Sequence, residues 1–253
     1  MSDLLRFPHV VFVISLVVLW LSSGLGNFIG RRLRPLQEEQ RDAFDVVQAA
    51  ILTLLGLLIG FTFSMAVSRY DQRKNYEEAE ANAIGTEYVR ADLLPVADAV
   101  RVRDLLRNYL DQRVLFYTTR DERELERINV STAQLQSELW STVQAPAAKS
   151  PTPVVALVVS GMNDVLNSQG YTQFAWSNLI PVAAWGLMAA IAICCSLLIG
   201  YGARRREIFL FSILPIAVSI SFFLIADMDS PRRGLIRVRP QNLISLSQSL
   251  QAH

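Results

Sequence analysis

The sequence predicts an all-α membrane protein with four transmembrane helices and a helical extramembrane domain between the second and third of them. Three observations support this fold class. Charged side chains are absent from four long apolar stretches, a polar tract with helical periodicity separates the second stretch from the third, and strand patterns are almost absent. Of the 253 residues 51% are hydrophobic, and the formal net charge is +1. That balance disfavours nucleic-acid binding, which requires a basic surface.

The apolar stretches have the length of membrane spans, because about 20 apolar helical residues cross the roughly 30 Å of hydrocarbon in a bilayer. The first stretch lacks a strongly basic start and a convincing cleavage site, which favours a retained helix over a cleaved signal peptide. The predicted spans lie near residues 9–30, 44–68, 178–201 and 207–227.

The polar tract is expected to form helices. The second span continues as a polar helix to Leu94 and stops at Pro95, and a further helix lies near 97–117. A third begins at "TTRDE", where Thr119 and Glu122 have capping-box spacing.

The remaining chain completes the predicted domain organisation. The segment "APAAKSPTP", 145–153, has the composition of a loop, and an apolar helix near 154–168 follows it. The predicted domains are 1–68 (transmembrane helices 1 and 2), 69–177 (helical extramembrane domain), 178–228 (transmembrane helices 3 and 4) and 229–253 (C-terminal tail).

Enzyme chemistry has little support in the sequence. The two histidines, His9 and His253, lie at a membrane edge and at the terminus, so neither a catalytic triad nor a histidine metal site is expected. The acidic residues Glu77, Glu78 and Glu80 have basic neighbours and suit a solvated helix face better than a metal or acid–base site. We therefore expect no enzyme activity, no cofactor and no metal.

The second span carries a distinctive face. Thr53, Leu57 and Phe61 recur at i, i+4 and i+8, which places them on one side of a helix. The nearby Gly56 and Gly60 permit close helix packing, and plain packing is the simpler interpretation of this face. Copied around a symmetric oligomer, however, the same face forms a narrow apolar constriction that gates by dewetting. Both interpretations remain open at this stage.

Basic residues follow directly after the apolar stretch. Arg69, Arg73 and Lys74 share one helical face. They suit either anchoring at lipid headgroups or a basic vestibule that concentrates anions at a pore mouth.

Several segments resemble known families. "IGFTFSMAVSRY", 59–70, resembles the second transmembrane helix of the bestrophin anion channels. "DMDSPRRG", 227–234, resembles a reduced form of the acidic-Pro-Gly segment after the last span in that family. Together with "EANAIGTEYVRADLLP" and "LLRNYLDQR", the pattern from 45 to 240 resembles the bacterial bestrophin-like domain family.

The resemblance implies a bestrophin-like fold and a pentamer whose central pore is lined by the second helix. By this resemblance the apolar pore neck of bestrophins corresponds to Phe61, Leu57 and Thr53 of this chain. Thr53 is polar and departs from the family pattern, which implies a wider neck at that position. The acidic calcium-binding cluster of animal bestrophins is reduced to Asp227 and Asp229, so calcium is not expected. Asp229 is expected to act as a turn or helix cap.

The favoured function is an oligomeric membrane ion channel for anions, with an apolar neck at Thr53, Leu57 and Phe61. The expected anion vestibule consists of Arg69, Arg73 and Lys74. The expected partners are identical subunits, membrane lipid and inorganic anions. The alternative is a non-conducting membrane anchor whose helical domain binds or senses a partner, because hydropathy alone does not separate the two.

The orientation signals conflict. The short loops carry Arg31, Arg32, Arg34, Arg41, Arg204, Arg205 and Arg206. Local charge bias across the first and third spans favours these loops on the cytoplasmic side. The resemblance instead places the extramembrane domain and both termini inside. We follow the resemblance and expect a multi-pass protein of the cell (inner) membrane with a cytoplasmic extramembrane domain.

Overall fold

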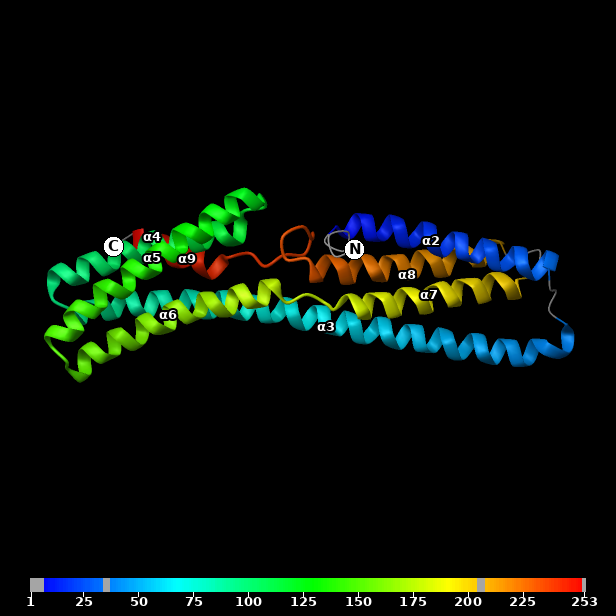
Figure 1. Ribbon diagram of the computed structural model, residues 1–253, viewed down its shortest axis with the longest axis horizontal. Helices are drawn as coiled ribbons and strands as arrows, with labels where there is room; N and C mark the ends of the chain where they lie inside the picture. Colours follow the sequence, from blue (N-terminus) through cyan, green and yellow to red (C-terminus); the bar gives the residue numbers. More distant parts are fainter. Residues whose placement is uncertain (1–6, 34–36, 204–207, 252–253) are drawn as a thin grey trace. The chain divides into compact units, whose positions relative to one another are not determined.

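The computed structural model describes residues 7–33, 37–203 and 208–251. Within these ranges every regular element is a helix and none is a strand, so the predicted all-α fold is confirmed (Figure 1). The elements are α2 (Pro8–Phe28), η1 (Ile29–Leu33), η2 (Glu38–Gln40), α3 (Arg41–Arg90), η3 (Ala91–Leu93), α4 (Val96–Thr118), α5 (Glu122–Lys149), α6 (Pro153–Ser177), α7 (Val182–Gly202), α8 (Ile208–Asp229) and α9 (Gln241–Gln251).

The chain divides into two compact units. One, which we term the membrane unit, comprises Met1–Arg69 and Leu179–Arg237, and the other, the helical unit, comprises Tyr70–Asn178 and Val238–His253. Four helices in the described part of the chain are long and apolar enough to cross a membrane, as the sequence predicts. Helix α3 contributes to both units and ends at Arg90. The short 3-10 helix η3 follows it and ends at Leu93, before Pro95, which lacks the backbone N–H needed to continue a helix.

The membrane unit is held together by apolar side chains and by one close helix crossing. Leu19, Leu55 and Met188 are among its buried residues. At the crossing of α2 and α7, a Cβ added to Gly26 would overlap the carbonyl of residue 197, and one added to Gly200 would overlap the carbonyl of residue 23. Small residues therefore permit the backbones of α2 and α7 to touch, which is how transmembrane helices associate without a hydrophobic driving force.

Replacing Gly200 with alanine should destabilise the membrane unit. The added methyl group meets backbone rather than a flexible side chain, and overpacking of this kind costs about 1–3 kcal/mol. Gly186 lies on the same helix with nothing within 4 Å of an added Cβ, so Gly186→Ala is the matched control. Thermal unfolding in detergent should show a lower midpoint for Gly200→Ala only. Equal midpoints would mean that the crossing is not closely packed.

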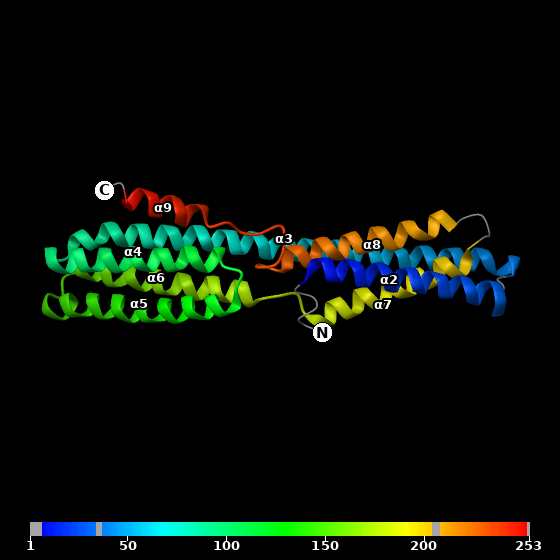
Figure 2. The ribbon, with the colours of Figure 1, turned by 90° about the horizontal axis from the view of Figure 1, so that it is seen from above.

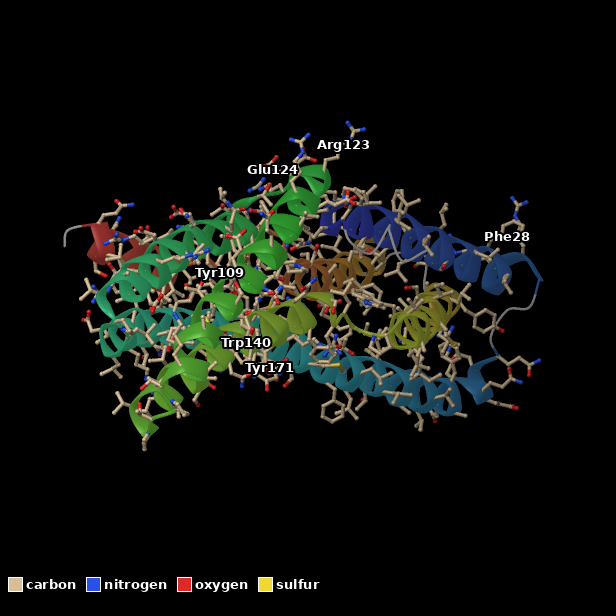
Figure 3. All side chains as sticks on the ribbon, turned by 60° about the vertical axis from the view of Figure 1, so that its left-hand side comes forward. Phe28, Tyr109, Arg123, Glu124, Trp140 and Tyr171 are labelled. Atoms are coloured by element: carbon tan, nitrogen blue, oxygen red, sulfur yellow. The ribbon has the colours of Figure 1, made fainter. Side chains whose placement is uncertain are left out.

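The helical unit packs α4, α5 and α6 beside the polar part of α3 (Figures 1 and 2). Val102, Leu106 and Tyr109 form the buried face of α4 in this core. The exposed residues Arg123 and Glu124 project away from the start of α5 (Figure 3).

Three helix boundaries predicted from sequence are wrong. Helix α5 is capped by Asp121, whose carboxylate accepts a hydrogen bond from the Arg123 backbone N–H, and not by Thr119. Residues 145–149 continue α5 rather than form a loop, because Pro146 removes only one backbone donor and its ring is buried. Helix α6 extends to Ser177, past the predicted end at 168.

The C-terminal segment, predicted as a tail, contains helix α9 in the helical unit. The Glu77 carboxylate accepts hydrogen bonds from the Leu243 backbone N–H at 3.0 Å and from Asn242 Nδ2 at 2.7 Å. A carboxylate at this place satisfies backbone donors that the first turn of a helix leaves unpaired, and it complements the positive end of the helix dipole. Glu77 of α3 therefore anchors the start of α9.

The arginines that bear on orientation are only partly described. Arg31 and Arg32 are exposed, and Arg41 pairs with Glu38 at 3.2 Å. Arg34, Arg204, Arg205 and Arg206 lie outside the described residues.

Candidate pore-lining face of α3

The three predicted neck residues lie on a face of α3 that no other part of the described chain covers. Leu57 is 52% exposed, Phe61 is 63% exposed, and Thr53 is also exposed. The opposite face is packed within the membrane unit, where Leu55 is 1% exposed and Ala66 is fully buried. The side chains at i, i+4 and i+8 thus share one uncovered face, as helical geometry requires.

The glycines beside this face do not contact the rest of the chain. A Cβ added to Gly56 or to Gly60 would meet no described atom within 4 Å. Packing inside one subunit, the simpler interpretation from sequence, therefore does not explain them. The nearby Ser64 and Ser68 are exposed as well. A face that mixes small and hydroxyl-bearing residues suits a neighbouring helix or a water-filled lumen better than lipid.

The three basic residues expected in the vestibule have different environments. The Arg69 side chain is largely buried, with its Nη1 3.8 Å from Asp229 Oδ1. Arg73 is 1% exposed, and its Nε donates a hydrogen bond to the Ala175 carbonyl at 3.1 Å. Lys74 is exposed.

The burial of Arg73 has a clear physical reason. Ala175 lies in the last turn of α6, where carbonyl groups lack partners inside the helix and arginine side chains satisfy them well. Arg73 thus faces the interior of the helical unit, contrary to the expectation that it lines a vestibule. Among the three basic residues, Lys74 alone has an exposed side chain in the described chain.

Arg69 and Lys74 should respond differently to neutralisation. Arg69→Gln removes a positive charge that lies close to the largely buried Asp229, so we expect a destabilisation of about 1–3 kcal/mol. Lys74→Gln changes an exposed residue, and its effect on stability should stay within about 0.5 kcal/mol. Thermal unfolding of both variants in detergent checks this. Two equal midpoints would show that the Arg69–Asp229 pair contributes nothing to stability.

The acidic residues after the last span form backbone contacts. Asp227 accepts hydrogen bonds from the backbone N–H groups of Leu235 at 2.6 Å and Ile236 at 2.8 Å. Asp229 accepts from the backbone N–H of Ile180 at 3.1 and 3.0 Å, so its carboxylate binds the segment that precedes α7. No group of three or more His, Cys, Asp or Glu side chains within the described ranges is placed to hold a metal ion.

The acidic stretch 77–80 is not the solvated face predicted from sequence. Glu77 and Glu80 are buried, while Glu78 is exposed. Glu80 forms a buried ion pair with Arg113 of α4, and its Oε2 also accepts hydrogen bonds from the Tyr117 hydroxyl at 3.1 Å and from Thr172 Oγ1 at 3.3 Å.

The electrostatics at this pair favour the charged form of Arg113. Burial alone would lower the pKa of Arg113, but the neighbouring Glu80 carboxylate raises it overall, so the guanidinium stays charged. Sequence reasoning missed this network because it assigned the charged residues of α3 to solvent.

Within the described residues, four helices long and apolar enough to span a membrane and a separate helical unit define a multi-pass membrane protein of helical type. The Bestrophin-like domain family matches residues 9–243, and the chain belongs to this family. Curated proteins give no match.

Solved structures share the fold. A bacterial bestrophin homologue from Klebsiella pneumoniae superimposes with a TM-score of 0.67 at 13% identity, over 95% of this chain and 97% of that one. A tyrosine-to-alanine variant of the homologue gives a TM-score of 0.68 at 12% identity, with 95% and 98% coverage. A leucine-to-threonine variant gives 0.66 at 12%, also with 95% and 98% coverage. These similarities confirm the bestrophin-like fold.

Proposed function

We propose that this chain is one subunit of a cyclic homo-oligomer, a pentamer by resemblance to bestrophins, that forms an ion channel in the cell (inner) membrane. The observation that carries the proposal is the uncovered face of α3 at Thr53, Leu57 and Phe61. Repeated contacts between unlike surfaces close into rings when the rotation permits, and a ring can place one helix of every subunit at its axis.

The neck follows from the residues on that face. Phe61 and Leu57 would form successive apolar rings around the axis, and a narrow apolar ring excludes water and hydrated ions until it widens. Thr53 would make the next ring more polar, because its hydroxyl oxygen remains an available acceptor while its proton is donated to the Ala49 carbonyl at 2.8 Å.

Anions are the proposed permeant ions, on the basis of the family resemblance. Of the three expected vestibule residues, the proposal retains Lys74 as the exposed positive charge that attracts anions. In this proposal Arg69 and Arg73 have structural roles, because Arg69 lies near Asp229 and Arg73 binds the end of α6. The helical unit is proposed to face the cytoplasm.

The proposal is tested by assembly and conduction together. Native mass spectrometry of the purified protein should give a single closed oligomer, and reconstituted liposomes should show ion flux that protein-free liposomes lack. Replacing chloride with a large impermeant anion should then abolish most of the flux. A monomer, or an intact oligomer that conducts no ion, would favour the non-conducting anchor.

A further inference from the structure

Glu87 is a buried carboxyl group without a hydrogen-bond partner. It lies in the polar part of α3, about five helical turns beyond the uncharged segment 46–68, and therefore outside the membrane span. Its exposure is 0%, and neither carboxylate oxygen accepts a hydrogen bond from any residue that the structure describes. An ionised carboxylate in such a place is costly, because it has lost water without gaining donors.

The Glu87 carboxyl packs directly against the backbone of α6. A Cβ added to Gly161 would overlap Glu87 Oε2 and Arg90 Nη1, so only glycine leaves room for both side chains. Arg90 uses its Nη1 to donate a hydrogen bond to the Leu157 carbonyl of α6 at 3.5 Å. A change in the charge or size of the Glu87 carboxyl therefore alters the packing of α6 at Gly161.

The charged groups that act on Glu87 are Arg90 from its own helix and Asp164 from α6. Burial raises the pKa of Glu87 to about 8, Arg90 opposes the shift, and Asp164 adds to it. The carboxyl group is therefore mostly protonated at neutral pH and ionises when the pH rises slightly above neutrality.

We propose that Glu87 is a proton-binding site between α3 and α6, and that loss of its proton loosens the packing of α6 at Gly161. The helical unit thereby senses pH. Proton binding by Glu87 does not require conduction, so the test of this proposal is independent of the test of the proposed channel. If the protein conducts, α3 carries both this site and the neck residues.

The sign of the pH dependence follows from linkage. The folded state binds the Glu87 proton more tightly than the unfolded state, whose carboxyl has the ordinary pKa of 4.5. Stability from this group is complete below about pH 4.5 and falls as the pH rises towards 8, with the unfolding constant increasing by up to about tenfold per pH unit. Above pH 8 the loss is constant.

The test compares the full-length protein with Glu87→Gln, which keeps the shape of the side chain but cannot ionise. Exposed Glu78 lies on the same helix, so Glu78→Gln is the matched control. Thermal unfolding in detergent between pH 5 and 9 should give equal midpoints for wild type and Glu87→Gln at pH 5, and a lower midpoint for wild type at pH 9. Glu78→Gln should follow the wild type throughout. Parallel curves for wild type and Glu87→Gln would overturn the proposal.

Two further measurements keep the proposal testable if Glu87→Gln folds poorly. Infrared difference spectra of the wild type between pH 6 and 9 should show a protonated carboxyl that titrates near pH 8, and absence of that band would overturn the assignment. Hydrogen exchange at pH 8.5 should be faster over residues 157–165 in the wild type than in Glu87→Gln. Equal exchange there would show that ionisation does not loosen α6.

Discussion

Phe61→Ala is expected to raise ion flux in reconstituted liposomes several-fold. The substitution removes the largest exposed apolar side chain of the proposed neck, widens the ring and weakens its tendency to exclude water. Leu57→Ala should act in the same direction with a smaller effect, because less apolar volume is removed. Flux is measured per assembled oligomer, so that changes in yield do not distort the comparison.

The control for the neck prediction lies on the opposite face of the same helix. Leu55 is 1% exposed and packs within its own subunit, so Leu55→Ala should destabilise the protein by about 2–5 kcal/mol without opening a pore. If Phe61→Ala and Leu55→Ala both lower stability and both leave flux unchanged, Phe61 does not face a conducting axis.

Arg113→Met is expected to be the most destabilising single substitution in the helical unit. It leaves the Glu80 carboxylate buried without its cation, and breaking one side of a buried pair costs about 3–5 kcal/mol. The double variant Glu80→Leu/Arg113→Met removes both charges, so it should recover much of the loss. Tyr117 and Thr172 then lack their shared acceptor, which keeps the recovery incomplete.

The exposed pair Arg127–Glu124 provides the comparison, since surface ion pairs contribute between about 0 and 1 kcal/mol. Arg127→Met should therefore leave the unfolding midpoint nearly unchanged. Similar midpoints for Arg113→Met and Arg127→Met would mean that Glu80 finds water or another partner in place of the guanidinium.

The spans were predictable because the bilayer imposes a simple rule on composition. An uncharged apolar run such as 46–68 has few alternatives to a transmembrane helix, and Pro95 predicts that the helical segment stops before it, although α3 itself ends at Arg90. That Thr53, Leu57 and Phe61 share one face was also predictable, since helical spacing fixes which side chains share a side; that no other part of the described chain covers this face was not.

The contribution of α3 to the interior of the helical unit was not predicted, because the buried face of that helix is charged. Glu77, Glu80 and Glu87 recur with Ile84 at helical spacing, and that periodicity was the available signal. Charged residues on a helix usually face water, so the pattern was assigned to solvent. The partners of Glu80 and Glu77, namely Arg113 and the backbone of α9, come from distant parts of the chain, so the local sequence does not reveal them.

Water access to residue 61 tests the central claim most directly, namely that the uncovered face of α3 lines a conducting axis. Exposed Cys194 and buried Cys195 are first replaced by alanine, and Phe61→Cys or Leu55→Cys is then introduced. A charged, water-soluble thiol reagent should modify Phe61→Cys and block ion flux through the assembled protein, while Leu55→Cys stays unmodified and conducts. Flux that persists after complete modification of Phe61→Cys, or a cysteine at 61 that the reagent never reaches, would contradict the account.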